Sequence, residues 1–112
     1  MLTYSTIQIH VKNAPALMPV MDRYETNSRP AVLLYEVEPE EDDEGLWCDL
    51  TVNLPQYALP GDDWAFVPLD NLKYLKELES QGLVEIGTAV RYGNFGQLAV
   101  MVHLSPYLMP KE

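Results

Sequence analysis

Residues 35–54, YEVEPEEDDEGLWCDLTVNL, decide the fold, because two runs of β-forming residues here flank a block of acid. Seven of the nine residues from 36 to 44 are Asp or Glu, with no Lys or Arg between them. Residues 31–38 are rich in β-formers. Residues 46–54 alternate, and the residues expected on the apolar, core-facing side are Leu46, Cys48, Leu50, Val52 and Leu54. We therefore expect a hairpin with the acid at its tip. Pro39 ends the first arm, and Gly45 frees the backbone at the start of the second.

The flanking sequence predicts further strands on both sides of this hairpin. Residues 3–12 alternate, with Ile7, Ile9 and Val11 on one face, which is typical of a half-buried strand. Residues 64–68 predict a short strand or an extended segment. Residues 83–92 and 97–104 predict a hairpin around the turn 93–96. Residues 13–30 hold three prolines and are left open between a short helix and an irregular crossing.

Residues 70–81 predict the one main helix. Asp70 is the expected N-cap, Leu72, Leu75 and Leu78 form an apolar stripe, and Gly82 ends the helix. Lys73 and Lys76 are spaced to pair with Glu77 and Glu79. The fold class is therefore α+β, an antiparallel β-sheet of about five strands with one main helix packed against it. We expect a single domain over residues 1–112, with the tail after Ser105 loosely held.

The charge of the chain is unevenly placed. Residues 30–72 contain eleven acids and no base, whereas the rest of the chain has six acids and seven bases, within a net charge of −10. Such a segment repels nucleic acid and anionic membrane surfaces. We therefore expect no direct nucleic-acid binding and no membrane binding, and a partner with a basic protein surface.

The cysteine content, the first residues and the length of the apolar runs together indicate the cellular compartment. Cys48 is the single cysteine, so no internal disulfide is expected. The first residues lack the pattern of a signal peptide, and no apolar run has the length of about 20 residues that a membrane helix needs. These features predict a cytoplasmic protein.

The residues that could carry chemistry do not form a recognisable site. Read from Glu40, the acidic block matches an EF-hand loop as far as Gly45, but Thr51 stands where a bidentate Glu is required. A nucleophilic site would have to use Cys48, His10 or His103, and neither histidine has an acid in a known motif. We expect no metal, no cofactor and no catalytic residue, and thus a protein that is not an enzyme.

Acidic and aromatic side chains together predict a partner-binding surface, because charge steers encounter and buried rings supply affinity. Trp47 follows the acidic block, and Trp64 follows two further acids. The alternative is that Trp47 only covers the second face of the sheet. The predicted partner-binding residues are Glu38, Glu40, Glu41, Asp42, Asp43, Glu44, Trp47, Asp62 and Asp63.

Five short runs between residues 50 and 93 carry a resemblance: LTVNLP (50–55), DWAFV (63–67), GLV (82–84), GT (87–88) and YG (92–93). On these runs, over residues 46–104, the chain resembles a short domain-of-unknown-function family carried on plasmids and conjugative elements of gut Firmicutes. The order in GTAVRYGNFG departs from the Thr-Gly order more usual in that family. The family has no established catalytic residues, so none is carried over.

The resemblance implies a mobile-element setting. Small acidic proteins in that setting are similar in kind to anti-CRISPR inhibitors, which occupy the basic nucleic-acid channel of a nuclease. We therefore expect a non-catalytic inhibitor of a Cas9-type CRISPR effector nuclease that blocks guide RNA or target DNA. Two alternatives stay open: an oligomeric scaffold or accessory module of a mobile element, including a homodimer, and a small enzyme acting on RNA.

Overall fold

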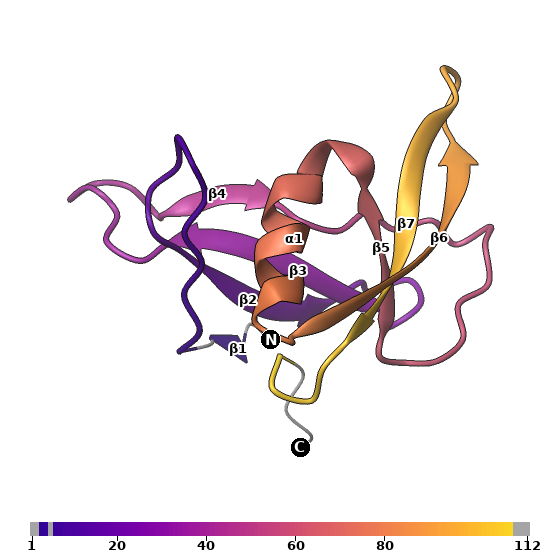
Figure 1. Ribbon diagram of the computed structural model, residues 1–112, viewed down its shortest axis with the longest axis horizontal. Coiled ribbons are helices and arrows are strands. Elements are labelled where there is room, and N and C mark those ends of the chain that lie inside the picture. Colours follow the sequence, from indigo (N-terminus) through magenta and orange to yellow (C-terminus); the bar gives the residue numbers. More distant parts are fainter. Residues whose placement is uncertain (1–2, 5, 109–112) are drawn as a thin grey trace.

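The computed structural model describes residues 3–4 and 6–108 and has an α+β fold with two antiparallel sheets and one helix (Figure 1). Sheet A has four strands in the order β1-β2-β3-β4, of which β1 has only two residues, and sheet B has three in the order β5-β7-β6. The elements are β1 (Thr3–Tyr4), β2 (Leu17–Arg23), β3 (Pro30–Glu36), β4 (Leu46–Asp49), β5 (Trp64–Pro68), the 3-10 helix η1 (Leu69–Asn71), α1 (Leu72–Ser80), β6 (Val84–Tyr92) and β7 (Gln97–Leu104).

The expectation of one sheet of about five strands is wrong, because the chain leaves sheet A after Asp49. Strand β4 covers only the first four residues of the predicted strand 46–54. Residues 50–63 then cross to the start of β5, with a single bridge between Val52 and Phe66 on the way. Pro55 and Pro60 lack the N–H group that a ladder needs, so no strand continues through this crossing.

Residues 13–30 contain a strand, which neither of the open alternatives included. Strand β2 pairs with β3 residue for residue, from Leu17 opposite Glu36 to Arg23 opposite Pro30. Pro19 lies inside this strand, beyond Val20 and Met21, the residues that pair with β1. The ladder with β1 therefore does not need the N–H group that Pro19 lacks.

The alternation of residues 3–12 predicts the buried side chains but not the secondary structure. Strand β1 ends at Tyr4, and Ser5 lies outside the described residues. Ile9 joins sheet A through a bridge to Leu17, with N–O distances of 2.8 and 3.0 Å. Ile9 is fully buried, and Ile7 and Val11 pack against the same core.

The hairpin of β6 and β7 confirms the strands predicted over 83–92 and 97–104. Gly93 and Gly96 have φ values of +74° and +65°, which L side chains rarely adopt, and so allow the turn between the strands. The register shifts between Ile86 and Ala89, where β6 holds one residue more than the facing part of β7. This β-bulge reverses the face on which later residues of β6 lie.

The helix forms where its leucine stripe predicts it, but its first turn differs. A 3-10 turn precedes α1, and Asn71 rather than Asp70 is the N-cap residue, without a side-chain cap bond. The Asn71 amide instead donates to the carbonyl oxygens of Asp49 and Leu50, both at 3.0 Å. Gly82, at φ +73°, ends the helix as predicted, and Lys76 pairs with Glu79 at 3.4 Å.

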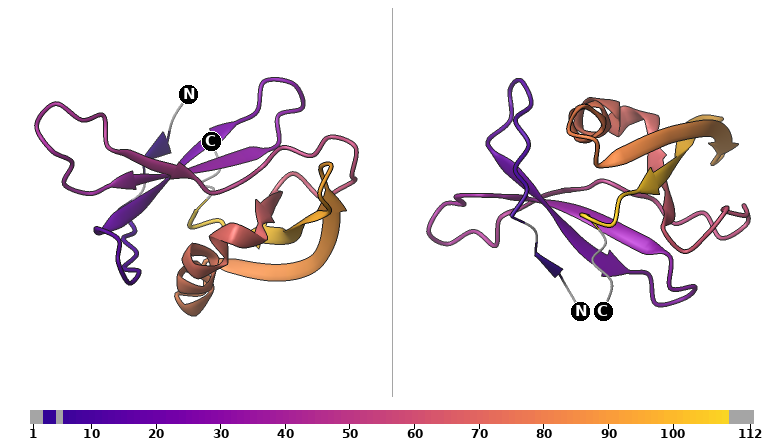
Figure 2. Two further views of the ribbon diagram at one scale, coloured as in Figure 1. Left: turned by 90° about the horizontal axis from the view of Figure 1, so that it is seen from above. Right: turned by 60° about the horizontal axis from the view of Figure 1, so that its bottom comes forward.

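Two cores form on opposite faces of sheet B. The main core lies between sheet A on one side and sheet B with α1 on the other, which the view from above shows (Figure 2). It includes Leu108, which is 1% exposed, so the expectation of a loose tail after Ser105 is wrong as far as residue 108, and residues 109–112 lie outside the described part. The smaller core joins Phe66 and Ala99 of sheet B to Leu54 of the crossing.

Two leucine truncations test this packing. Leu75 is fully buried in the main core, whereas Leu69 is 41% exposed. We expect Leu75→Ala to lower the free energy of unfolding by about 2–5 kcal/mol, because it leaves a cavity. The same change at Leu69 should cost less than about 0.5 kcal/mol. Urea denaturation followed by circular dichroism measures both, and equal losses would contradict the assigned core.

Candidate functional site

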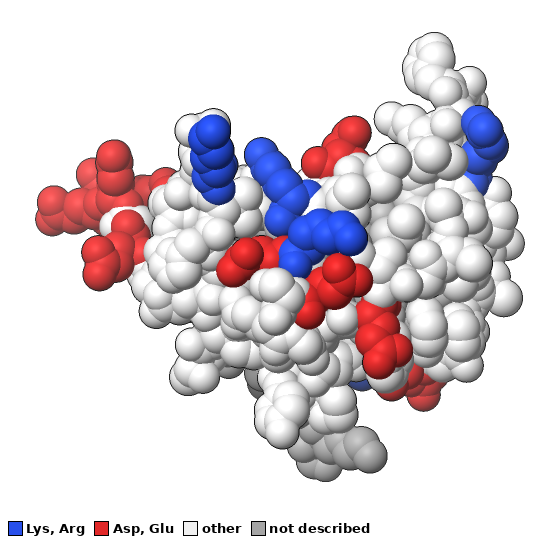
Figure 3. Space-filling model, viewed as in Figure 1, with Lys and Arg blue, Asp and Glu red and all other residues white. Residues whose placement is uncertain are grey.

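The acidic loop, defined as residues 37–45, joins β3 to β4 at one end of the molecule. Figure 3 shows its acidic side chains projecting from that end, apart from the rest of the surface. Because they project into solvent, these carboxylates can reach a partner without any rearrangement of the core. Six predicted binding residues belong to this loop and are all exposed: Glu38, Glu40, Glu41, Asp42, Asp43 and Glu44.

Hydrogen bonds within the loop hold these acids in place. The Asp43 amide donates to the Glu40 carbonyl at 2.9 Å, and the Gly45 amide donates to the Asp43 carboxylate at 2.9 Å. The Glu36 amide closes the loop by donating to the Gly45 carbonyl at 2.7 Å. Gly45 is buried at φ +89° and faces the Pro39 ring. The carboxylates therefore project from a formed loop.

The loop carboxylates have no positively charged partner within the described residues. The ion pairs found between those residues are Lys76 with Glu79 and His103 with Asp63. Neither involves the acidic loop. Basic side chains lie over the middle of the molecule in Figure 3, separated from the loop. No described base therefore neutralises the negative charge of the loop, which favours attraction of a cationic partner.

Trp47 lies at the base of the loop and is 40% exposed. Its indole N–H donates to the hydroxyl of Tyr74 on α1 at 2.9 Å. Part of the indole therefore serves the contact between sheet A and the helix, and the remainder faces solvent beside the acids. Trp47 is therefore neither a residue that only covers the second face of the sheet nor a fully exposed anchor.

The prediction of which residues in 46–54 face the core is partly wrong, because the pairing of β4 with β3 contains an irregularity. Cys48 lies opposite Leu34, but Leu46 lies opposite Tyr35, so the register slips by one residue at Trp47. This irregularity breaks the period of two. Leu46, expected on the core face, is 49% exposed, whereas Leu50 is 1% exposed as predicted.

Asp62 and Asp63, also predicted to bind the partner, lie away from the acidic loop. Asp62 lines a depression with residues of the turn between β2 and β3. That turn and the acidic loop lie at opposite ends of β3, and a seven-residue strand spans roughly 20 Å. The nine predicted residues therefore form two separate groups, and only the group of the acidic loop with Trp47 is contiguous.

Asp63 pairs with His103, a contact that the sequence does not reveal because 40 residues separate the two. The Asp63 carboxylate and His103 Nε2 are 2.6 Å apart, and the Trp64 ring lies 5.2 Å from the imidazole. Such a pair can exchange a proton with a substrate only if a cavity holds that substrate nearby. The side chains of His103 and Asp63 are 32% and 50% exposed and do not line the depression beside Asp62.

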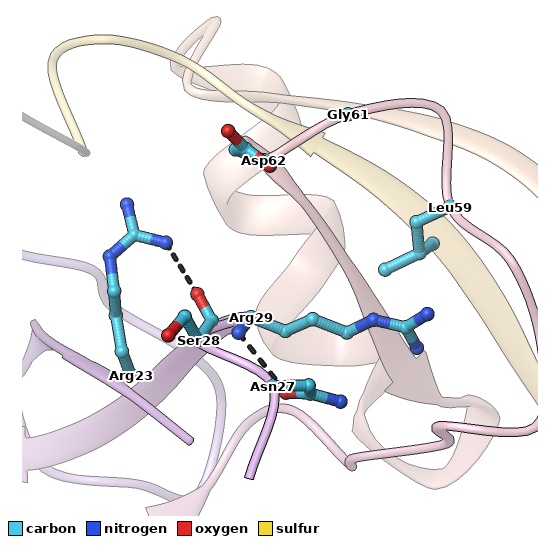
Figure 4. A pocket seen from close by; sticks show the side chains of 7 residues that line it. All are labelled: Arg23, Asn27, Ser28, Arg29, Leu59, Gly61 and Asp62. Atoms are coloured by element: carbon cyan, nitrogen blue, oxygen red, sulfur yellow. Dashed lines mark hydrogen bonds between the residues drawn. The ribbon is translucent and has the colours of Figure 1, made fainter. Parts of the chain in front are cut away.

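The depression beside Asp62 has a volume of about 490 Å³ and is open to solvent (Figure 4). Arg23 donates to the Ser28 carbonyl at 2.7 Å. Arg29 runs along the depression and donates to the carbonyls of Leu54 and Tyr57, at 2.8 and 2.6 Å. Arg29 therefore helps to hold residues 50–63, which cross from sheet A to sheet B. No sequence pattern indicates this role of Arg29.

Cys48 is half-buried and packs against the main core, in agreement with its expected position on the core-facing side of its strand. Burial raises the pKa of its thiol, the Asp49 carboxylate raises it further, and Lys73 opposes these effects. The thiolate is therefore disfavoured at neutral pH, which is the opposite of what a nucleophilic cysteine needs.

Residues 3–4 and 6–108 hold neither a cluster of potential metal ligands nor a membrane-spanning helix. No group of three or more His, Cys, Asp or Glu side chains is arranged there to hold a metal ion. The helices described there are too short and too polar to cross a membrane.

Comparisons with models of known protein families, with curated proteins and with solved structures found no match for this chain. The candidate site therefore stands on the geometry and charge of the chain itself.

Two glycine variants test whether the acidic loop is held as described. Gly45→Ala places a Cβ 3.2 Å from the Pro39 Cβ at a positive φ, whereas a Cβ at Gly82, also at positive φ, meets nothing within 4 Å. Both variants carry a backbone cost of about 1 kcal/mol, and only the first also displaces the loop. Urea denaturation should show a larger loss for Gly45→Ala, and equal losses would argue against the contact with Pro39.

The raised pKa of Cys48 predicts a pH dependence of its alkylation. The midpoint of the rate profile with iodoacetamide should lie at higher pH in the folded protein than in the urea-unfolded chain. Comparing midpoints rather than rates separates the pKa from steric shielding. A folded-state midpoint at or below that of the unfolded chain would refute the assigned environment.

Proposed function

We propose that the protein is a non-catalytic binding protein whose acidic loop docks against a basic surface of a partner protein. The observation that carries this proposal is the set of exposed carboxylates in a loop formed by its own hydrogen bonds, with no cationic partner among the described residues. A fixed cluster of one sign of charge raises the rate of association with an opposite charge.

The specific form of the proposal is an inhibitor of a type II CRISPR nuclease of the Cas9 type. In this form the loop occupies the basic channel that otherwise receives guide RNA or target DNA, with Trp47 as an apolar anchor. Support comes from the base-free charge of residues 30–72 and from the resemblance to a family of mobile elements. Asp62 and Asp63 take no part in this contact, because they lie near the far end of β3.

A charge-reversed loop tests the proposal. Glu40, Glu41, Asp42 and Glu44 are all exchanged for Lys, while Asp43 is kept because its carboxylate holds the Gly45 amide. The association rate with a Cas9-type nuclease should fall roughly 10- to 1,000-fold at low salt, because electrostatic steering is lost. Biolayer interferometry with and without guide RNA, together with a DNA cleavage assay, measures the effect.

The matched control reverses four exposed acids outside the loop, Glu25, Asp62, Asp70 and Glu85, which gives the same change in net charge. This control should bind more tightly than the loop variant, because the loop is intact. Equal binding by the two variants would show that only net charge matters. Failure of the unmodified protein to bind the nuclease in either state would reject the CRISPR form of the proposal.

A further inference from the structure

The outer face of sheet A is the face turned away from α1 and sheet B (Figure 2). Burial alternates along β3, where Val32 and Leu34 point into the main core and Leu33 and Tyr35 are half-buried on the outer face. Strand pairing extends this outer face across the sheet. Val20 of β2, opposite Leu33, is fully buried on this face, so the open part of the face is the end that borders the acidic loop. Tyr35 lies opposite Met18 of β2 and Leu46 of β4.

These four residues form what we call the apolar strip, which consists of Met18, Leu33, Tyr35 and Leu46. Three adjacent strands contribute to it, and Leu46 is its most exposed member at 49%. The strip adjoins the acidic loop directly, since that loop begins two residues after Tyr35 and ends immediately before Leu46. An apolar surface and a cluster of carboxylates therefore share one border.

Within β2, β3 and β4, the charged residues at outward positions are acids. Asp22 and Asp49 occupy outward positions, opposite Ala31 and Leu33. The one base in β2, β3 or β4 is Arg23, which lies opposite Pro30, at an inward position of the alternation. A ligand that covers this face therefore contacts apolar side chains and carboxylates. It meets no basic side chain of β2, β3 or β4.

We propose that the outer face of sheet A, with the acidic loop, is the docking surface for a cationic amphipathic segment of a partner protein. The apolar side chains of that segment lie on the strip, and its Lys and Arg side chains meet the loop. This inference rests on the proposed function and specifies the chemistry of the partner. An anionic membrane does not fit, because the acids of the loop and of the outer face repel it.

The two parts of this surface have separate physical effects. The loop accelerates encounter and makes binding sensitive to salt. The strip supplies affinity by removing apolar area from water, and this contribution persists when salt screens the charges. A purely electrostatic loop would not distinguish a cationic amphipathic segment from a polar cationic segment of equal charge.

Two synthetic peptides provide the test. The first is a helical Leu/Lys peptide with its leucines on one face, and the second has Gln in place of every Leu and the same length and charge. Isothermal titration calorimetry at an ionic strength of about 0.15 M compares their affinities for the full chain. We expect the Leu/Lys peptide to bind roughly ten-fold more tightly.

Two variants locate the apolar contribution. Leu46→Gln should lower the affinity for the Leu/Lys peptide roughly ten-fold and leave the affinity for the Gln/Lys peptide unchanged. Leu69→Gln is the matched control, since Leu69 is similarly exposed at 41% but lies on η1, outside sheet A. Circular dichroism verifies that both variants are folded. Equal effects of the two substitutions would overturn the assignment to the strip.

The outcomes separate this inference from the proposed function. Equal affinity of the unmodified protein for both peptides overturns the apolar docking surface but leaves an acidic binding protein. Binding of neither peptide overturns both. Tighter binding of the Leu/Lys peptide that disappears with Leu46→Gln and survives Leu69→Gln supports the docking surface.

Discussion

The fold depends on how residues 50–63 are held as they carry the chain from sheet A to sheet B. The backbone polar groups of this crossing do not join a continuous ladder, and hydrogen bonds made by side chains help to hold the crossing in place. Arg29 donates to the carbonyls of Leu54 and Tyr57, and its guanidinium lies 6.0 Å from the centre of the Phe66 ring. The Thr51 hydroxyl, itself buried, accepts the Val32 amide at 3.1 Å. These bonds fix one sheet against the other, and with it the separation of the acidic loop from the second acidic group.

Local sequence signals predict much of the architecture, because apolar periodicity and turn residues act over short distances. The hairpin of β6 and β7, the leucine stripe of α1 and the β3 strand all follow from such signals. The division into two sheets does not, since it depends on contacts such as that of Arg29 with Tyr57, 28 residues away. The slip at Trp47 is invisible for the same reason, because only pairing with β3 reveals it.

The candidate site likewise has a part that local sequence predicts and a part that depends on the fold. The acidic loop is continuous in sequence, so its charge and exposure could be predicted without coordinates. Asp62 and Asp63 are near it in sequence but not in space, and the Asp63 carboxylate is engaged by His103. The apolar strip could not be predicted, because Met18, Leu33 and Leu46 belong to three strands whose register only the fold establishes. Charge thus belongs to one segment, whereas apolar surface is assembled from several.

The β-bulge in β6 has a consequence for self-association. Strand β6 ends the order of sheet B, so its outer edge has no partner strand within the described residues. Before the bulge Glu85 lies opposite His103, and after it Arg91 lies opposite Leu98, which places these two charges on opposite faces of the sheet. A second β6 laid antiparallel along this edge could not bring Glu85 of one copy and Arg91 of the other to the same face, and the bulge interrupts a regular ladder. The irregularity thus disfavours the growth of sheet B by addition of identical strands.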